Sequence, residues 1–209
     1  MIPSGYSKTV LEGTLPGGEI WQCGIWANEA PSDEAATQAQ ADAFGADFTT
    51  TWGGSHNNIG NFWASNTGIT QLRTYSYLDD SGKATYVGVH DLSHFGSATQ
   101  SMPDQIALAI TLQTGYSGRR RRGRIYWPVN AGALSSGQLS EAQCGNFCDF
   151  FATLLDAWNT HLASQSMVVL SQVAGNSHPI TAIRVDSKLD TQRRRAQSMA
   201  ANATATQAL

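Results

Sequence analysis

The sequence predicts an α+β fold in which a largely antiparallel β-sheet is covered by two helices. Six or seven segments are rich in β-forming residues, and most are joined by connections of hairpin length. Two further segments repeat apolar residues at helical spacing. The chain has 209 residues, enough for one domain with a core, and shows no repeat or interdomain linker. We expect residues 1–195 to form a single domain. Residues 196–209, which lack a periodic face, are expected to form a C-terminal tail or an arm ordered by a partner.

Runs of β-branched and aromatic residues predict the strands. Residues 70–78 and 84–90 flank Asp79-Asp80-Ser81-Gly82, whose residue types favour a tight turn, so they are expected to form a hairpin. Residues 105–113 are apolar on both faces, which is typical of a central strand. We expect its large face to fill the core and its face of small residues to admit a helix. The other predicted strands are 19–26, taken as the first, 124–127, 167–173 and 180–185.

Two helices are predicted from capping residues and apolar spacing. The first opens at Pro31-Ser32-Asp33-Glu34, with Ser32 as the expected cap, and has a narrow stripe of Ala36, Ala39, Ala43 and Phe44. The second runs from Glu141 to about Leu162, and Ser140 with Gln143 fits a capping box. Its wide apolar stripe must be buried against the sheet. That stripe comprises Phe147, Phe150, Phe151, Leu154, Leu155, Trp158 and Leu162.

The charge of the chain is unevenly distributed. The formal net charge is −3, yet eight of the thirteen basic residues are arginines in two short runs. Such arginines form bidentate contacts with carboxylates, so we expect them to meet acidic surface on a neighbouring subunit or elsewhere in the chain. Contact with nucleic-acid phosphates is the second interpretation, and a solvated loop is the third. The eight are Arg119, Arg120, Arg121, Arg122, Arg124, Arg193, Arg194 and Arg195.

Known catalytic motifs are missing from the sequence: it has no nucleophile elbow, P-loop, dinucleotide fingerprint or zinc-protease motif. His90 and His94, with Asp91 between them, form the best candidate for metal binding or acid–base chemistry, but their segment ends a strand, so helical spacing is not assured. Asp79 and Asp80 are expected in a turn for backbone reasons. We therefore predict no enzymatic activity, no catalytic residues, no metal and no cofactor.

Three cysteines cannot all pair within one chain. Cys144 and Cys148 are four residues apart on a predicted helix, a poor geometry for a disulfide, and Cys23 lies in a predicted strand. We expect three reduced, buried thiols in a protein made in a cytoplasm. The sequence contains no run of about 20 apolar residues, and its first residues do not resemble a signal peptide. We therefore expect neither a membrane span nor secretion.

Aromatic residues raise the hypothesis of carbohydrate recognition, because aromatic rings stack on sugars. Of the six tryptophans, Trp52 and Trp63 lie in the glycine-rich stretch 52–68, which is expected to be a long loop or two short irregular strands. These two are the candidate ligand-facing aromatic residues. The remaining tryptophans in predicted elements are expected to belong to the core.

Four stretches together resemble a family of small virion-associated proteins of bacterial viruses. They are Gly18-Glu-Ile-Trp-Gln-Cys-Gly-Ile-Trp26, Met102-Pro-Asp-Gln-Ile-Ala-Leu-Ala-Ile110, Arg122-Gly-Arg-Ile-Tyr-Trp-Pro128 and Val185-Asp-Ser-Lys-Leu-Asp-Thr-Gln-Arg-Arg-Arg195. Such proteins have a Gly-Arg-Ile-Tyr-Leu-Pro-like strand and end near an Asp-x-Gln-Arg-Arg-Arg motif. This sequence departs from the pattern with Trp127 in place of the Leu and with a longer arginine run. The resemblance spans about residues 10 to 195 and implies a structural component of the capsid or tail.

Taken together, these features predict a non-enzymatic virion structural protein that self-assembles through charged and apolar subunit interfaces. Its expected partners are copies of itself and other virion proteins, and its expected location is the virion, after synthesis in the host cytoplasm. A nucleic-acid-binding coat or packaging protein is the alternative, because it would use the same arginines. A glycan-binding domain is the third hypothesis.

Overall fold

The computed structural model describes residues 2, 4–14, 20–53, 68–95, 106–114, 122–129, 141–170, 177–189 and 203–208. These residues form nine strands and two helices, and every strand pair is antiparallel. The predicted α+β class is therefore confirmed. In chain order the elements are β1 (Tyr6–Thr14), β2 (Ile20–Ala27), α1 (Glu34–Gly53), β3 (Gly68–Tyr77), β4 (Tyr86–Phe95), β5 (Ile106–Thr114), β6 (Arg122–Val129), α3 (Glu141–Thr160), β7 (Met167–Leu170), β8 (Ser177–Leu189) and β9 (Ala203–Ala208).

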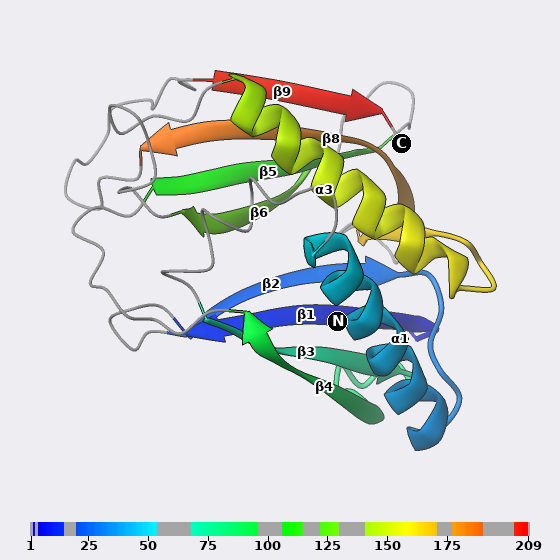
Figure 1. The fold of residues 1–209 in the computed structure, drawn as a ribbon. Helices are drawn as coiled ribbons and strands as arrows, with labels where there is room; N and C mark the ends of the chain where they lie inside the picture. Colours follow the sequence, from blue (N-terminus) through cyan, green and yellow to red (C-terminus); the bar gives the residue numbers. More distant parts are fainter. Residues whose placement is uncertain are drawn as a thin grey trace.

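The strands form one continuous sheet in two halves, and both helices lie on the same face of it (Figure 1). The strand order is β4-β3-β1-β2-β7-β8-β5-β6, with β9 paired to β8. The long strand β8 joins the halves, because its first residues pair with β7 and its later residues pair with both β5 and β9. Helix α1 packs on β3 and β4, whereas α3 packs on β8 and β9.

Several predicted strands are confirmed. The β3–β4 hairpin closes through a turn in which Asp79 accepts a hydrogen bond from the backbone N–H of Ser81, at 3.0 Å, and Gly82 has a φ of +79°. The backbone role expected for Asp79 therefore holds. Strand β5 is central in its half, with β6 on one side and β8 on the other.

Strand β1 was not predicted, because its buried face is polar. Ser7 and Thr9 are almost fully buried, and the hydroxyl of Thr9 lies 3.4 Å from that of Thr74 on β3. Such small polar side chains on the inner face hide the alternation of apolar and polar residues by which a strand is recognised. The first predicted strand, 19–26, is therefore the second strand of the fold, β2.

The tail interpretation is wrong for Ala203–Ala208. These residues form β9, which pairs with Ala182–Ser187 of β8 and lies beside α3. Alternating Ala and Thr give no apolar stripe, but the free edge of β8 supplies backbone hydrogen-bonding partners, which local sequence cannot reveal. The other residues of the predicted tail lie outside the described part of the chain.

Helix α1 differs from its prediction in its cap and its buried face. Asp33, not Ser32, is the cap, because its carboxylate accepts a hydrogen bond from the backbone N–H of Ala36 at 2.8 Å. Ala39 is exposed and Ala36 and Ala43 are half-buried, so the predicted alanine stripe is not the buried face. That face instead comprises Thr37, Ala41, Phe44, Gly45, Phe48 and Thr51.

The apolar stripe of α3 forms the centre of the core, as predicted. All seven predicted residues are buried, and Trp158 contacts α1 through a stacked pair with Phe44, whose ring centroid lies 4.9 Å from its own. On the sheet side, Ile183 of β8 is buried in the same core, and the register pairs it with Leu112. Helix α3 therefore lies on the side of the sheet to which the register assigns the large residues of β5, and the expectation that a helix approaches the small-residue face is wrong for α3.

Small residues allow α1 to lie unusually close to the edge strand β4. A Cβ atom at Gly88 would collide with the backbone carbonyl oxygen of Thr37. Nearby, the side-chain amide of Gln38 donates to the carbonyl oxygen of Val89 at 2.8 Å and accepts from its N–H at 3.0 Å. Gln38 thus satisfies backbone groups of β4 in the way a further strand would, which protects this edge of the sheet.

This close packing predicts opposite effects for two glycine-to-alanine substitutions. Gly88→Ala should lower the free energy of unfolding by about 1–3 kcal/mol, because the new methyl group meets backbone that cannot rotate away. Gly145→Ala in α3 is the matched control, since nothing lies within 4 Å of the added Cβ. It should raise stability by about 0.5–1 kcal/mol through helix propensity. Urea unfolding measures both, and an unaffected Gly88→Ala variant would contradict the packing.

Candidate functional site

The candidate site is the face of the sheet opposite the helices, which we call the open face. Its residues alternate along β1 with Ser7, Thr9 and Leu11, which are buried on the helix side. The strand register arranges the open face of this half in three rows across β2, β1, β3 and β4. The rows are Trp26, Lys8, Tyr75 and Val87; Gly24, Val10, Arg73 and Val89; and Gln22, Glu12, Gln71 and Asp91.

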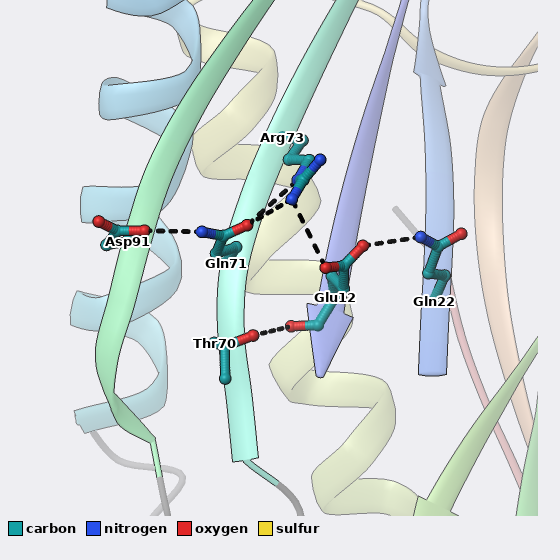
Figure 2. A network of polar contacts seen from close by, with 6 residues as sticks. All are labelled: Glu12, Gln22, Thr70, Gln71, Arg73 and Asp91. Atoms are coloured by element: carbon teal, nitrogen blue, oxygen red, sulfur yellow. Dashed lines mark hydrogen bonds and ion pairs between the residues drawn. The ribbon is translucent and has the colours of Figure 1, made fainter. Parts of the chain in front are cut away.

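The third row is a polar network that crosses four strands, with the helices behind them (Figure 2). Gln22 donates to the carboxylate of Glu12 at 2.7 Å, and the guanidinium of Arg73 lies 3.7 Å from the other oxygen of that carboxylate. Arg73 also donates to the amide oxygen of Gln71 at 2.8 Å, and Gln71 donates to Asp91 at 3.0 Å. Because each group restrains its neighbour, the network presents Arg73 and two carboxylates in a fixed arrangement.

The first row is aromatic and aliphatic. The amine of Lys8 lies 5.6 Å from the ring centroid of Trp26, within cation–π range, and Trp26 in turn contacts Tyr77 with ring centroids 5.6 Å apart. Val87 has 43% of its surface exposed, a high value for a large aliphatic residue. Aromatic, aliphatic and cationic groups therefore lie side by side at this end of the open face.

Two of the predicted arginines lie in β6, where the structure describes the backbone. The register pairs Arg122 with Gln113 and Arg124 with Thr111, and Thr111 also pairs with Arg184 of β8. Directly paired residues of an antiparallel sheet share a face, so Arg124 and Arg184 fall in one row, two strands apart. Arg184 carries no local signal in the sequence, because strand pairing alone brings it to this row.

These arginines fall on the open face. Ile183, which precedes Arg184, is buried beneath α3, and consecutive strand residues lie on opposite faces. The open face therefore continues from Lys8 and Arg73 in one half to Arg122, Arg124 and Arg184 in the other. The remaining predicted arginines, Arg119, Arg120, Arg121, Arg193, Arg194 and Arg195, lie outside the described residues, as do Trp63 and the side chain of Trp52.

A pocket of about 530 Å³ lies on the other side of the molecule, beside α1. Glu29 and the loop after β2 form one wall, Ala36, Ala39, Gln40 and Ala43 of α1 form the floor, and His161 at the end of α3 completes it. The imidazole of His161 lies 2.9 Å from the carboxylate of Asp47. Gln40 lines the pocket, but its amide oxygen is buried away from solvent and has no hydrogen-bond partner among the described residues.

His90, one of the two histidines of the best candidate in the sequence, forms a contact between β4 and α1. His90 Nδ1 lies 2.9 Å from the carboxylate of Asp42, which also accepts from Gln38 at 3.1 Å. These hydrogen bonds, that of His90 first, hold the pKa of Asp42 below its usual value. The side chain of His94 is not among those described, so the pairing of His90 with His94 is untested.

The three cysteines are buried and none forms a disulfide, as expected. Burial raises the pKa of the Cys23 thiol far above its usual value, so the thiolate needed for reaction or metal binding is strongly disfavoured. Among the residues that the structure describes, no cluster of three or more His, Cys, Asp or Glu side chains could hold a metal ion. Neither described helix is both long and apolar enough to cross a membrane.

Comparisons with known proteins find no relative of this chain: no family model, curated protein or solved structure matches it.

The Asp42–His90 contact predicts a pH dependence of stability. The pKa of Asp42 is lower in the folded than in the unfolded chain, so its stabilising effect is present above a pH of about 4 and is lost as the pH falls through the folded value. Because the pair is partly exposed, the effect should be about 0.2–1 kcal/mol.

Asp42→Asn should therefore be less stable than the parent at pH 6, and the difference should shrink below about pH 3. Thermal unfolding across this range measures it. His90→Gln and the double variant complete a mutant cycle, in which the two losses should not add. A constant difference at all pH values would contradict the assignment.

Proposed function

We propose that this chain is a non-enzymatic structural protein of a virion, a component of the capsid or tail, which self-assembles through its open face. The observation that supports this most is the composition of that face. Exposed Val87 and half-buried Trp26 and Tyr75 adjoin a fixed polar network, and Arg122 and Arg124 fall on the same side. Aromatic residues and arginine are the types enriched in protein–protein interfaces.

The arrangement of these groups favours contact with protein. An antiparallel sheet commonly leaves one face in water, but such a face is normally polar. Here the aromatic row lies next to a network whose carboxylate and guanidinium groups are already held in place. Groups that are ordered before association lose little conformational entropy when a partner binds, which favours a tight contact.

Nucleic-acid binding is the second candidate, and one observation favours it. Half-buried aromatic residues and basic residues share the open face of an antiparallel sheet, and nucleic-acid-binding sheets stack bases on such aromatic rings. The glycan-binding hypothesis rests on Trp52 and Trp63, whose side chains are not described, so no observation favours it.

Removal of two open-face arginines should separate these functions. Arg122→Ala with Arg124→Ala should weaken self-association by about tenfold or more and leave the monomer folded, because the register places both residues on the side of the sheet opposite the helices. Lys83→Ala, in the β3–β4 turn, is the matched control and should associate like the parent. Sedimentation over a concentration series measures association, and circular dichroism measures folding.

The salt dependence and the 260/280 nm absorbance ratio of the purified parent complete the test. A subunit interface predicts moderate salt dependence and an absorbance ratio typical of protein alone. If the parent is a monomer that retains nucleic acid, and its affinity falls steeply with salt, the nucleic-acid function replaces the one proposed.

A further inference from the structure

Charge is divided between the two layers of the molecule. We call residues 28–53 and 141–166, which contain α1, α3 and their adjoining turns, the helix layer. This layer has eight carboxylates and no Lys or Arg, a formal charge of −8. All thirteen basic residues lie in the strands and the other connections, with the remaining eight carboxylates, a formal charge of +5. The carboxylates of the helix layer are Glu29, Asp33, Glu34, Asp42, Asp47, Glu141, Asp149 and Asp156.

The negative charge of the helix layer is accessible from solvent. Asp149 and Asp156 are exposed on α3, and seven residues of helix separate them by about 10 Å. Glu34 is exposed in the first turn of α1. The pocket beside α1 belongs to this layer too, and Glu29 is one of its lining residues. A carboxylate suits a guanidinium, which is a donor without an acceptor.

The positive charge concentrates on the opposite side of the sheet. Arg122, Arg124, Arg184 and Lys188 fall on the open face of the β6–β5–β8 half, with Asp186 as the acidic residue among them. In the other half, Lys8 and Arg73 accompany Glu12 and Asp91, and the polar network already engages those two carboxylates. Among the described residues, the open face of the β6–β5–β8 half therefore has a formal charge of +3, opposite in sign to that of the helix layer.

We propose that copies of the chain associate head to tail, with the open face of one copy on the helix layer of the next. This rests on the proposed self-assembly and specifies its geometry. A two-fold contact would place either two basic faces or two acidic layers against each other, which is electrostatically unfavourable. The head-to-tail contact instead places the arginines against the carboxylates. Repetition of such a contact builds a ring or an open stack.

Complementary charge reversal tests this geometry. A sheet variant combines Arg122→Glu with Arg124→Glu, and a helix variant combines Asp149→Lys with Asp156→Lys. Asp149 and Asp156 are exposed, and the register places Arg122 and Arg124 on the side of the sheet opposite the helices. Each variant alone should associate about tenfold or more weakly than the parent, because like charges now meet. An equimolar mixture should regain association, since the intact faces pair with each other and the reversed faces are also complementary. Circular dichroism shows that each variant is folded, and sedimentation measures association.

The alternatives give different results. One outcome is that the parent self-associates, the helix variant behaves like the parent, and mixing the two variants restores no association. Copies then meet sheet to sheet. In that case the head-to-tail inference is wrong, and the proposed structural role stands. If the parent stays a monomer at every concentration and salt, both are wrong. If only nucleic acid binds the open face, the sheet variant loses that binding, the helix variant keeps it, and the inference again fails.

Discussion

The fold depends on the contact between Trp158 and Phe44. The Trp158 indole is fully buried, stacks on the ring of Phe44 with an interplanar angle of 14°, and donates a hydrogen bond to the Phe44 carbonyl oxygen at 3.0 Å. This contact joins α3, which covers β8 and β9, to α1, which covers β3 and β4. Both helices are therefore joined on one side of the nine-stranded sheet, opposite the open face.

Local patterns were sufficient for the fold class and for the elements with strong periodicity. The wide stripe of α3 and the turn at Asp79–Gly82 are readable because each follows from nearby residues. The elements that were missed depend on distant partners. Strand β1 buries the polar side chains of Ser7 and Thr9, with the hydroxyl of Thr9 near that of Thr74 on β3, and β9 becomes a strand because β8 offers it an edge. Likewise, the alanines of α1 line a pocket, because the larger residues Phe44 and Phe48 occupy the core.

The candidate site was only partly accessible from the sequence. The arginine runs are visible there, but the row of Arg124, Thr111 and Arg184 exists only through strand register. The network of Glu12 and Arg73 was likewise hidden, because strand β1, which carries Glu12, was not recognised. The separation of charge between the helix layer and the rest of the chain is present in the sequence. It produces an acidic surface only when the two helices lie in one layer. Six of the eight predicted arginines and both candidate tryptophan side chains lie outside the described residues and remain predictions.

In the proposed head-to-tail contact, the basic open face of one copy meets the acidic helix layer of another. Carbodiimide cross-linking of mixed ¹⁴N- and ¹⁵N-labelled chains tests it most directly, because the reagent joins a lysine amine to a carboxylate without a spacer and mixed labels identify links between copies. We expect mixed-label links from Lys8 or Lys188 to Asp149 or Asp156. Mixed-label links from those lysines to Glu12, Asp91 or Asp186 instead would place two sheets together, and would contradict it.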